Sequence, residues 1–295
     1  MSDDQWSIRV EPPVLMPGKP VTVSLGYTPI RDHESRGVRV VLGCIERYRY
    51  ERSEMAPDGK GMRRVTHTGV EELSRVEVTA AGPGRFVRGQ AQAWEVTFDV
   101  PGLGPATFGG EVLRCDWTLT TSIDIPRAID EQIAQPVPVA QPMALLRAGV
   151  IDTGMYGLFA EAPANTDAHP AQIRLEPVPI SLQSPFTGEF TVETAAPLAV
   201  QEVRLELRVI ADVSVSGGHH EEIIVWRGGL EAASQTFGGA LTRHPFRADA
   251  SGAWLPSVDL PHGKARGQFH VILALAWEPD IHYVRDVALA TTTEL

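Results

Sequence analysis

The sequence predicts an all-β protein made of two β-sandwich domains in tandem. Hydrophobic content of 43% and charged content of 21% are typical of a globular protein. Glycine (27 residues) and proline (23 residues) are abundant and scattered, which suits many short strands joined by turns. In most strand-like segments apolar and polar residues alternate with a period of two, which is the pattern of a strand with one buried face.

The alternation is clearest at 20–27, 37–50 and 201–215. The run at 37–50 is apolar at first and charged towards its end, so we expect this strand to leave the core partway. The stretch at 51–68 is polar and contains Pro-Asp-Gly, which predicts a hairpin tip or loop. The proline-containing run at 135–139 predicts an edge strand, because proline cannot donate into a central ladder. No segment predicts a helix longer than one or two turns.

The two halves of the chain echo each other. Residues 94–125 and 254–281 each hold Asp, an apolar residue and Pro at the end of a strand-like run, then a second run that ends in Asp-Ile. The run at 38–40 matches 203–205 in the same order. We interpret the echo as an internal duplication in which 94–125 is the core hairpin of the first sandwich. Each copy has about seven or eight strands, as an immunoglobulin-like sandwich requires. A single large sandwich with a chance echo is the alternative.

We therefore expect an N-terminal sandwich at 1–140, an apolar inter-domain linker at 141–171 and a C-terminal sandwich at 172–295. The linker is too apolar for a solvated segment and keeps neither helical nor strand spacing. One interpretation is that it fills the seam between the domains. The other is a partner-binding or oligomer-forming surface, because exposed apolar patches mark contact sites. The candidate partner-binding residues are Leu145, Leu146, Met155, Tyr156, Leu158 and Phe159.

The order of these elements resembles a known family. A Pro-Gly turn and a strand come first, then VRVVLGC or VRLELRV, then DVP or DLP, and the first half closes on PVPV. This order resembles the arrestin-like fold, two tandem immunoglobulin-like sandwiches found in arrestins, retromer subunits and bacterial sporulation-control proteins. The resemblance covers nearly the whole chain and implies a non-catalytic scaffold or adaptor. The charged polar core that animal arrestins use as a phosphate switch has no counterpart in this sequence, so the resemblance does not imply a phosphate-triggered mechanism.

Charge and cysteine content narrow the function classes. The net charge is −11, with −3 in residues 1–140 and −8 in residues 141–295. Neither half is basic, so we expect no nucleic-acid partner. No apolar run reaches the roughly 20 residues that span a bilayer, and the opening residues, MSDDQW, lack a secretion-signal pattern. Cys44 and Cys115 lie in strand-like runs and predict two buried thiols in a reducing compartment, so we expect a cytoplasmic protein.

The sequence offers little catalytic chemistry. It contains no GxSxG, HExxH, GxxxxGK[ST] or strand-linked GxGxxG motif, so we expect no enzyme, no cofactor and no metal site. The cluster at 219–222, HHEE, could supply metal ligands, but adjacent residues of a strand point to opposite faces and favour a solvated hairpin. The stretch at 46–54, ERYRYERSE, could stack nucleic-acid bases, but its glutamates favour cross-strand ion pairs. Most tryptophans occupy alternate strand positions that also hold other apolar residues, which predicts that they fill the core. They are Trp94, Trp117, Trp226 and Trp277.

The function that these observations favour is protein binding. We expect an adaptor that binds a protein partner along a sandwich edge by strand addition, or through the apolar linker. A ligand- or carbohydrate-binding sandwich is one alternative, which exposed tryptophans would favour. A second alternative is a homo-oligomer or a subunit of a larger assembly. A third is an enzyme with a site at His219, His220 and Glu222.

Overall fold

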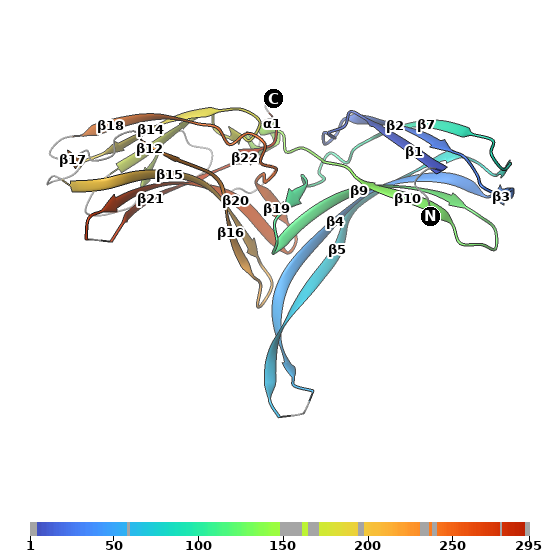
Figure 1. Cartoon of the computed structure of the whole chain (residues 1–295), viewed down its shortest axis with the longest axis horizontal. Helices are drawn as coiled ribbons and strands as arrows, with labels where there is room; N and C mark the ends of the chain where they lie inside the picture. Colours follow the sequence, from blue (N-terminus) through green and yellow to red (C-terminus); the bar gives the residue numbers. More distant parts are fainter. Residues whose placement is uncertain are drawn as a thin grey trace. The chain divides into compact units, whose positions relative to one another are not determined.

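The computed structural model is nearly all-β, with 67% strand and 2% helix, which confirms the all-β class that the sequence predicts (Figure 1). The structure describes residues 5–57, 60–147, 161–164, 171–193, 198–230, 236–237, 241–277 and 279–292. In this part of the chain the one helix is α1 (Met143–Arg147). The chain divides into two compact units. Unit 1 comprises Met1–Arg47, Val70–Thr107 and Cys115–Ala140, and unit 2 comprises Tyr48–Gly69, Phe108–Arg114 and Gln141–Leu295. The predicted domain boundaries stay a prediction.

Unit 1 contains a three-stranded sheet of order β1-β2-β7 and a five-stranded sheet whose main path is β10-β9-β4-β5. The strands are β1 (Trp6–Glu11), β2 (Pro20–Tyr27), β3 (His33–Ser35), β4 (Gly37–Met55), β5 (Met62–Ala81), β6 (Gly84–Phe86), β7 (Gln92–Asp99), β9 (Leu113–Asp124) and β10 (Glu131–Pro136). β3 pairs with β6. The outer part of the β4–β5 hairpin, β8 (Phe108–Gly109) and the first residues of β9 belong to unit 2.

The two sheets of unit 1 share one apolar core. Tyr27 of β2 lies in the same buried cluster as Val38 of β4 and Ile123 of β9, and Trp6 and Trp94 pack against this cluster. The buried faces arise from the alternation seen in the sequence, because every second side chain of these strands points inward. Burial of each such side chain contributes about 1.5–3 kcal/mol to the hydrophobic free energy of folding.

The β4–β5 hairpin is longer than the sequence indicates. β4 alternates between buried and half-buried residues as far as Glu46 and then becomes exposed, which confirms that this strand leaves the core partway. The predicted hairpin tip lies within 51–68, but strand occupies more of this stretch than expected, because β4 runs to Met55 and β5 begins at Met62. β10 lies at the edge of its sheet and ends at Pro136, so only the first two residues of the predicted edge strand at 135–139 belong to a strand, and Val139 forms an isolated bridge with Leu15.

Unit 2 also has two main sheets, one of order β11-β12-β14-β18 and one of path β16-β15-β20-β19, with β17 added to β15 and β21 to β20. The strands are β11 (Glu161–Ala164), β12 (Ala171–Glu176), β13 (Ile180–Ser181), β14 (Phe186–Val192), β15 (Leu198–Val213), β16 (His220–Gly229), β17 (Thr236–Phe237), β18 (Thr242–Ala248), β19 (Val258–Leu260), β20 (Gly263–Leu275), β21 (Ile281–Val287) and β22 (Leu289–Ala290). β15 and β16 form the antiparallel hairpin that the sequence predicts.

Aromatic rings join the two sheets of unit 2. Phe246 of β18 stacks on Phe269 of β20 with a centroid distance of 5.1 Å. Phe186 of β14 meets the same Phe269 edge-on at 6.0 Å, and Phe190 lies 5.3 Å from Tyr283 of β21. Edge-on and offset pairs of this kind are favourable beyond the area that they bury. The two main sheets of unit 2 therefore pack against each other through aromatic side chains.

The strand orders of the two units correspond. The path β10-β9-β4-β5 in unit 1 has the same chain order as β21-β20-β15-β16 in unit 2, and β1-β2-β7 corresponds to β12-β14-β18. The expected core hairpin at 94–125 was wrong, because β7 and β9 lie in different sheets. By contrast β19 pairs directly with β20, so the counterpart of β19 is the short β8, which pairs with β9.

Candidate functional site

The outer hairpin, residues 48–69, pairs with a turn of unit 2 along one edge of β4. β4 extends past the start of β9, so its outer main-chain groups need other partners. Three hydrogen bonds supply them: Arg49 N–H to the Val112 carbonyl (2.8 Å), Glu51 N–H to the Gly217 carbonyl (2.7 Å) and His219 N–H to the Arg49 carbonyl (3.2 Å). Tyr50 and Gly218 form an antiparallel bridge. The β15–β16 turn thus takes the place of a short strand beside β4.

Among the described residues, the same edge of β4 has no partner beyond Glu51. Alternate residues of a strand present their N–H and C=O groups to the same edge, so Ser53 and Met55 continue the edge that Arg49 and Glu51 use. Within the ranges that the structure describes, no strand or turn pairs with β4 on this side after Glu51. An open edge of this kind is a template for an additional strand.

A groove of about 690 Å³ lies where the paired edge ends. The outer hairpin and the β15–β16 turn line it with Tyr48, Tyr50, Glu51, Arg52, Ser53, Arg64, Val215, Ser216 and Gly217. We call it the hairpin groove. Its volume is in the range of ligand sites, and tyrosine and arginine are the residue types enriched where proteins bind partners.

Stacked rings fix the two tyrosines of the groove. Tyr48 stacks on His262 with a centroid distance of 4.2 Å and an interplanar angle of 11°. Tyr50 stacks on His67 of β5 at 5.5 Å. The Tyr48 ring also covers Gly69, where a Cβ would overlap the ring. Rings that are already held in place lose little conformational entropy when a ligand binds.

Gly217 and Glu221 hold the turn against the hairpin. Gly217 has φ +72°, and a Cβ at this position would overlap the Glu51 carbonyl oxygen. Only glycine meets both conditions without strain. The Glu221 carboxylate accepts hydrogen bonds from the Glu111 N–H (2.8 Å) and the Val112 N–H (3.0 Å). These two N–H groups precede β9 and find their acceptor in β16.

The outer hairpin around the groove is locally positive. Residues 48–69 carry five basic and three acidic side chains, a net charge of +2 in a chain of net −11. Arg64 pairs with Glu51 at 3.6 Å, and its side chain is 82% exposed. An ion pair as exposed as this contributes little, so a ligand can replace it at small cost. Within the described ranges Arg52 makes no ion pair. The groove therefore favours an acidic ligand.

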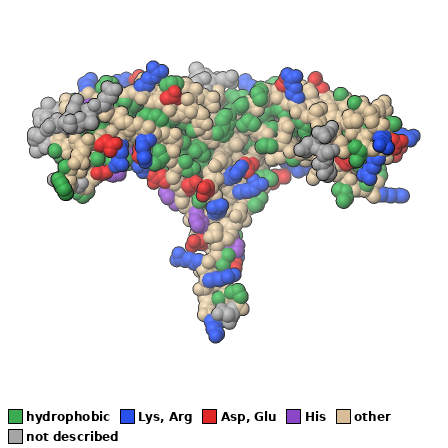
Figure 2. All heavy atoms as spheres, in the orientation of Figure 1, with side chains coloured by type: hydrophobic (Ala, Val, Ile, Leu, Met, Phe, Trp, Pro, Cys, Tyr) green, Lys and Arg blue, Asp and Glu red, His purple; other side chains and the backbone are tan. Residues whose placement is uncertain are grey.

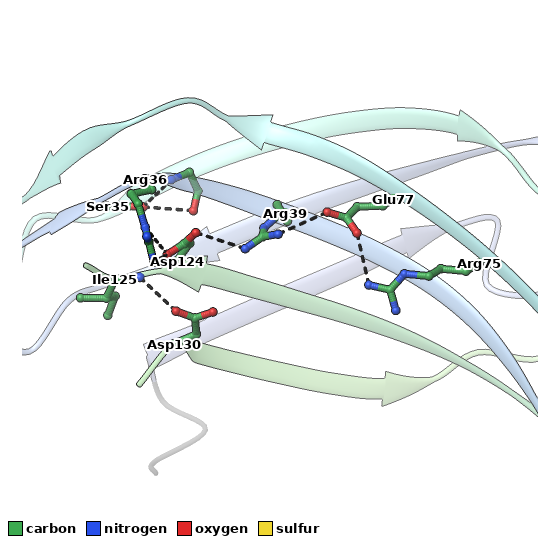
Figure 3. A network of polar contacts seen from close by, with 9 residues as sticks. Ser35, Arg36, Arg39, Arg75, Glu77, Asp124, Ile125 and Asp130 are labelled. Carbon is green, nitrogen blue, oxygen red and sulfur yellow. Dashed lines mark hydrogen bonds and ion pairs between the residues drawn. The ribbon is translucent and has the colours of Figure 1, made fainter. Parts of the chain in front are cut away.

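Unit 1 carries a second charged cluster on the surface of β4, β5 and β9. Figure 3 shows Asp124 between Arg36 and Arg39, and Glu77 between Arg39 and Arg75. Asp124 accepts from Arg36 Nε at 2.7 Å and from Arg39 Nη2 at 3.2 Å. The hydrogen bond from Arg75, followed by that from Arg39, lowers the pKa of Glu77. Each carboxylate is already matched by cations, so this cluster ties three strands together rather than forming an open site.

A third polar cluster is buried on the six-stranded sheet of unit 2. Glu206 is 1% exposed and accepts from Arg208 Nε and Arg227 Nε, each at 2.7 Å. Burial opposes ionisation of Glu206, but its two arginines outweigh that effect and lower its pKa. The cross-strand neighbour of Glu206 is His270, whose pKa falls to about 4, chiefly through burial. Its Nε2 lies 3.2 Å from the Gln268 side-chain oxygen.

The structure describes two of the six predicted partner-binding residues. Leu146 of α1 is fully buried and clusters with Met143, Ala288 and Ala290, and Leu145 is half-buried. The other four residues, Met155, Tyr156, Leu158 and Phe159, lie outside the described residues.

The side chains of three residues of the HHEE cluster have separate partners. His220 contacts Asp212 at 2.7 Å, Glu222 pairs with Arg208, and Glu221 accepts from the main chain before β9. The ERYRYERSE stretch makes the expected ion pairs, with Arg47 on Asp116 and Glu51 on Arg64 (3.6 Å). Sequence reasoning missed the hairpin groove, although the alternation of tyrosine and arginine in this stretch was its signal.

The tryptophans do not all fill the core. Trp117 is 1% exposed and donates to the Pro105 carbonyl at 2.7 Å, and Trp226 is half-buried against Phe269. Trp277 is fully exposed and has φ +67°, so the prediction that it fills the core was wrong. Trp277 follows the end of β20 at Leu275, and beyond a strand side chains no longer alternate between two faces.

The described part of the chain contains no helix long and apolar enough to cross a bilayer. No protein-family model and no curated protein sequence matches this chain.

Proposed function

We propose that the protein is a non-catalytic, cytoplasmic adaptor of the arrestin-like type, built from two tandem immunoglobulin-like sandwiches. It binds an extended segment of another protein, which adds as a strand to the outer part of β4. The matching strand orders of the two units support the tandem arrangement and the internal duplication. Two buried, unoxidised thiols, Cys44 and Cys115, suit a reducing compartment.

The observation that carries the proposal is that β4 loses its strand partner at the hairpin groove. Up to Glu51 the β15–β16 turn occupies this edge, and from Ser53 onward no residue of the described ranges pairs with it. A partner segment can continue the ladder from the position where the turn leaves it. Main-chain hydrogen bonds then supply affinity, and the groove side chains supply specificity.

The chemistry of the groove selects the partner segment. Arg52 and Arg64 favour carboxylate side chains, which guanidinium groups bind in a bidentate way. Tyr48 and Tyr50 offer flat apolar faces to the residues between those carboxylates. The proposed ligand is therefore an extended protein segment in which acidic and apolar residues alternate.

Photo-cross-linking tests this proposal. A benzophenone amino acid at Ser53, inside the groove, is compared with one at Thr68, which is also exposed on the outer hairpin but does not line the groove. We expect the Ser53 probe to label one contiguous acidic segment of one protein and the Thr68 probe not to label it. Equal labelling from both positions, or labelling scattered over many proteins, would contradict the proposal.

Trp277 favours a second candidate function, the binding of carbohydrate. A fully exposed tryptophan presents both ring faces, and carbohydrate sites use such faces for stacking. The backbone at Trp277 has φ +67°, which is unfavourable for a bulky residue, so glycine there would be less strained. Binding on a glycan array that is lost in Trp277→Ala would establish this function. An array on which the native protein binds no glycan would exclude it.

A further inference from the structure

β5 presents an unprotected edge in unit 1. The strand ends the path β10-β9-β4-β5, and within the described ranges no strand, bridge or turn pairs with its outer side along 73–79. At the opposite edge of the same sheet, β10 has only six residues and ends at Pro136. Short strands, prolines and lysines protect sheet edges from pairing with other chains. The segment 73–79, LSRVEVT, contains neither proline nor lysine, so this edge lacks such protection.

This segment has one apolar face and one charged face. Ala80 packs against the buried cluster of unit 1, and the half-buried Val76 and Val78 share its face. Arg75 and Glu77 are exposed on the other face, where Arg75 Nη2 lies 3.2 Å from Glu77 Oε2 (Figure 3). A strand with these two faces can extend the sheet of another molecule without burying an unpaired charge.

The segment is complementary to its own reverse. When two copies lie antiparallel with Val76 opposite Val76, each Arg75 lies opposite Glu77 of the other copy. The two-fold axis repeats this contact, so the register contains two pairs of opposite charge. On the apolar face Val78 lies opposite Ser74. Cross-strand pairs of opposite charge stabilise a sheet, whereas like charges directly opposite each other destabilise it.

From this register we propose that two copies of the chain form a dimer by pairing β5 with β5 antiparallel along 73–79. The five-stranded sheets of unit 1 in the two copies then join into one sheet. In an antiparallel pair every second position exchanges two main-chain hydrogen bonds, so this overlap supplies about six to eight of them. The contact is isologous and closes after two copies, so it does not propagate into a fibre.

Charge selects both this partner and this register. A chain of net charge −11 repels its own copy at long range, so a contact between copies requires matched local pairs. Figure 2 shows Lys and Arg side chains intermixed with Asp and Glu on the surface, so such pairs are available. A shift of two residues in either direction places Arg75 opposite Arg75 or Glu77 opposite Glu77. The exposed contacts of Arg75 with Glu77 and Glu72 in one copy contribute little, so Arg75 can turn to the second copy at small cost.

Cysteine cross-linking tests the register. Val76→Cys places one thiol of each copy at the two-fold axis, so oxidation with copper phenanthroline should join two chains through a disulfide. Val78→Cys is the matched control, because it shares the same face but lies opposite Ser74 of the second copy. The native Cys44 and Cys115 are fully buried and should not contribute. Non-reducing electrophoresis should show a covalent dimer for Val76→Cys and none for Val78→Cys.

Charge exchange tests the ion pairs. Sedimentation should give the native protein twice the mass of one chain. Arg75→Glu and Glu77→Arg each turn two attractive pairs into repulsive ones and should weaken dimerisation at least about tenfold. An equimolar mixture of these two variants again sets opposite charges against each other and should dimerise like the native protein. Mixing cannot repair a folding defect, so recovery identifies the interface. Arg9→Glu, on the exposed face of β1, controls for net charge and should leave the dimer intact.

Three results would overturn the inference. The first is a native protein that stays monomeric, as it would if this edge bound only a different protein. The second is equal cross-linking of Val76→Cys and Val78→Cys, or no cross-linking of either. The third is a mixture of the two charge variants that stays monomeric. Ser53→Pro, in the hairpin groove of unit 2, should leave the dimer intact, so this inference and the proposed function fail independently.

Discussion

The Sγ atom of Cys44 lies 3.2 Å from the Sγ atom of Cys115, between the neighbouring strands β4 and β9 of unit 1. Both side chains are 0% exposed. The hydrogen bond with Cys44, followed by burial, raises the pKa of the Cys115 thiol. A neutral thiol is a poor nucleophile, so this pair is shielded both sterically and electrostatically.

We therefore expect the native protein to resist alkylation by iodoacetamide at mildly alkaline pH. Both cysteines should react quickly once guanidinium unfolds the chain. Intact-mass spectrometry before and after denaturation counts the modified thiols. Rapid modification of the folded protein would contradict the burial of this pair.

Glu206 should be among the most sensitive charged positions. Glu206→Ala leaves Arg208 without its buried acceptor, and we expect a loss of about 3 kcal/mol in the free energy of unfolding. This loss is at the lower end of what removing one partner of a buried ion pair usually costs, because the side chain of Arg227 is 58% exposed. Urea denaturation measures the loss. Glu11→Ala, which removes an exposed ion pair with Arg9, is the control and should cost less than about 1 kcal/mol.

Gly217 should tolerate substitution less well than a glycine of the same backbone conformation. Gly217 and Gly89 both have φ +72°, but only Gly217 has a carbonyl oxygen, that of Glu51, where a Cβ would lie. Gly89→Ala should cost about 1 kcal/mol from the backbone alone. Gly217→Ala adds a steric clash and should cost clearly more, and it should weaken partner binding by moving the turn. Equal costs in thermal unfolding would contradict the close contact between the turn and the hairpin.

His270 should make stability depend on pH. The pKa of His270 in the folded protein is about 4, chiefly because of burial and then the charge of Arg208. An unfolded histidine has a pKa of about 6.5. Between these values the unfolded chain binds more protons, so stability falls as the pH is lowered through this window. His270→Gln should remove up to about 1.4 kcal/mol per pH unit from this slope. Parallel slopes for the native protein and the variant, measured by urea denaturation, would contradict the assignment.

The sequence allowed the buried strands to be predicted, because alternation reports directly on which face a side chain occupies. It predicted a hairpin tip or loop at 51–68 but not how far the strands extend into this stretch, because residues here interact through ion pairs and stacked rings such as Tyr50 on His67 rather than through an apolar face. Nor could it place the β15–β16 turn beside β4, since that contact joins Glu51 to Gly217 across most of the chain. The hairpin groove depends on both features and was missed for that reason.

The most direct test of strand addition replaces Ser53, whose N–H faces the open edge of β4. Proline at this position removes the donor but breaks no ladder bond on the β5 side, and Ser53→Ala controls for the lost hydroxyl. Titration calorimetry with a peptide of the cross-linked partner segment measures the affinity of each variant. Our account predicts that Ser53→Ala binds like the native protein. Ser53→Pro should lose at least about tenfold in affinity, because one main-chain carbonyl of the bound segment is then left without its hydrogen bond. Equal affinity of Ser53→Pro and Ser53→Ala would contradict it.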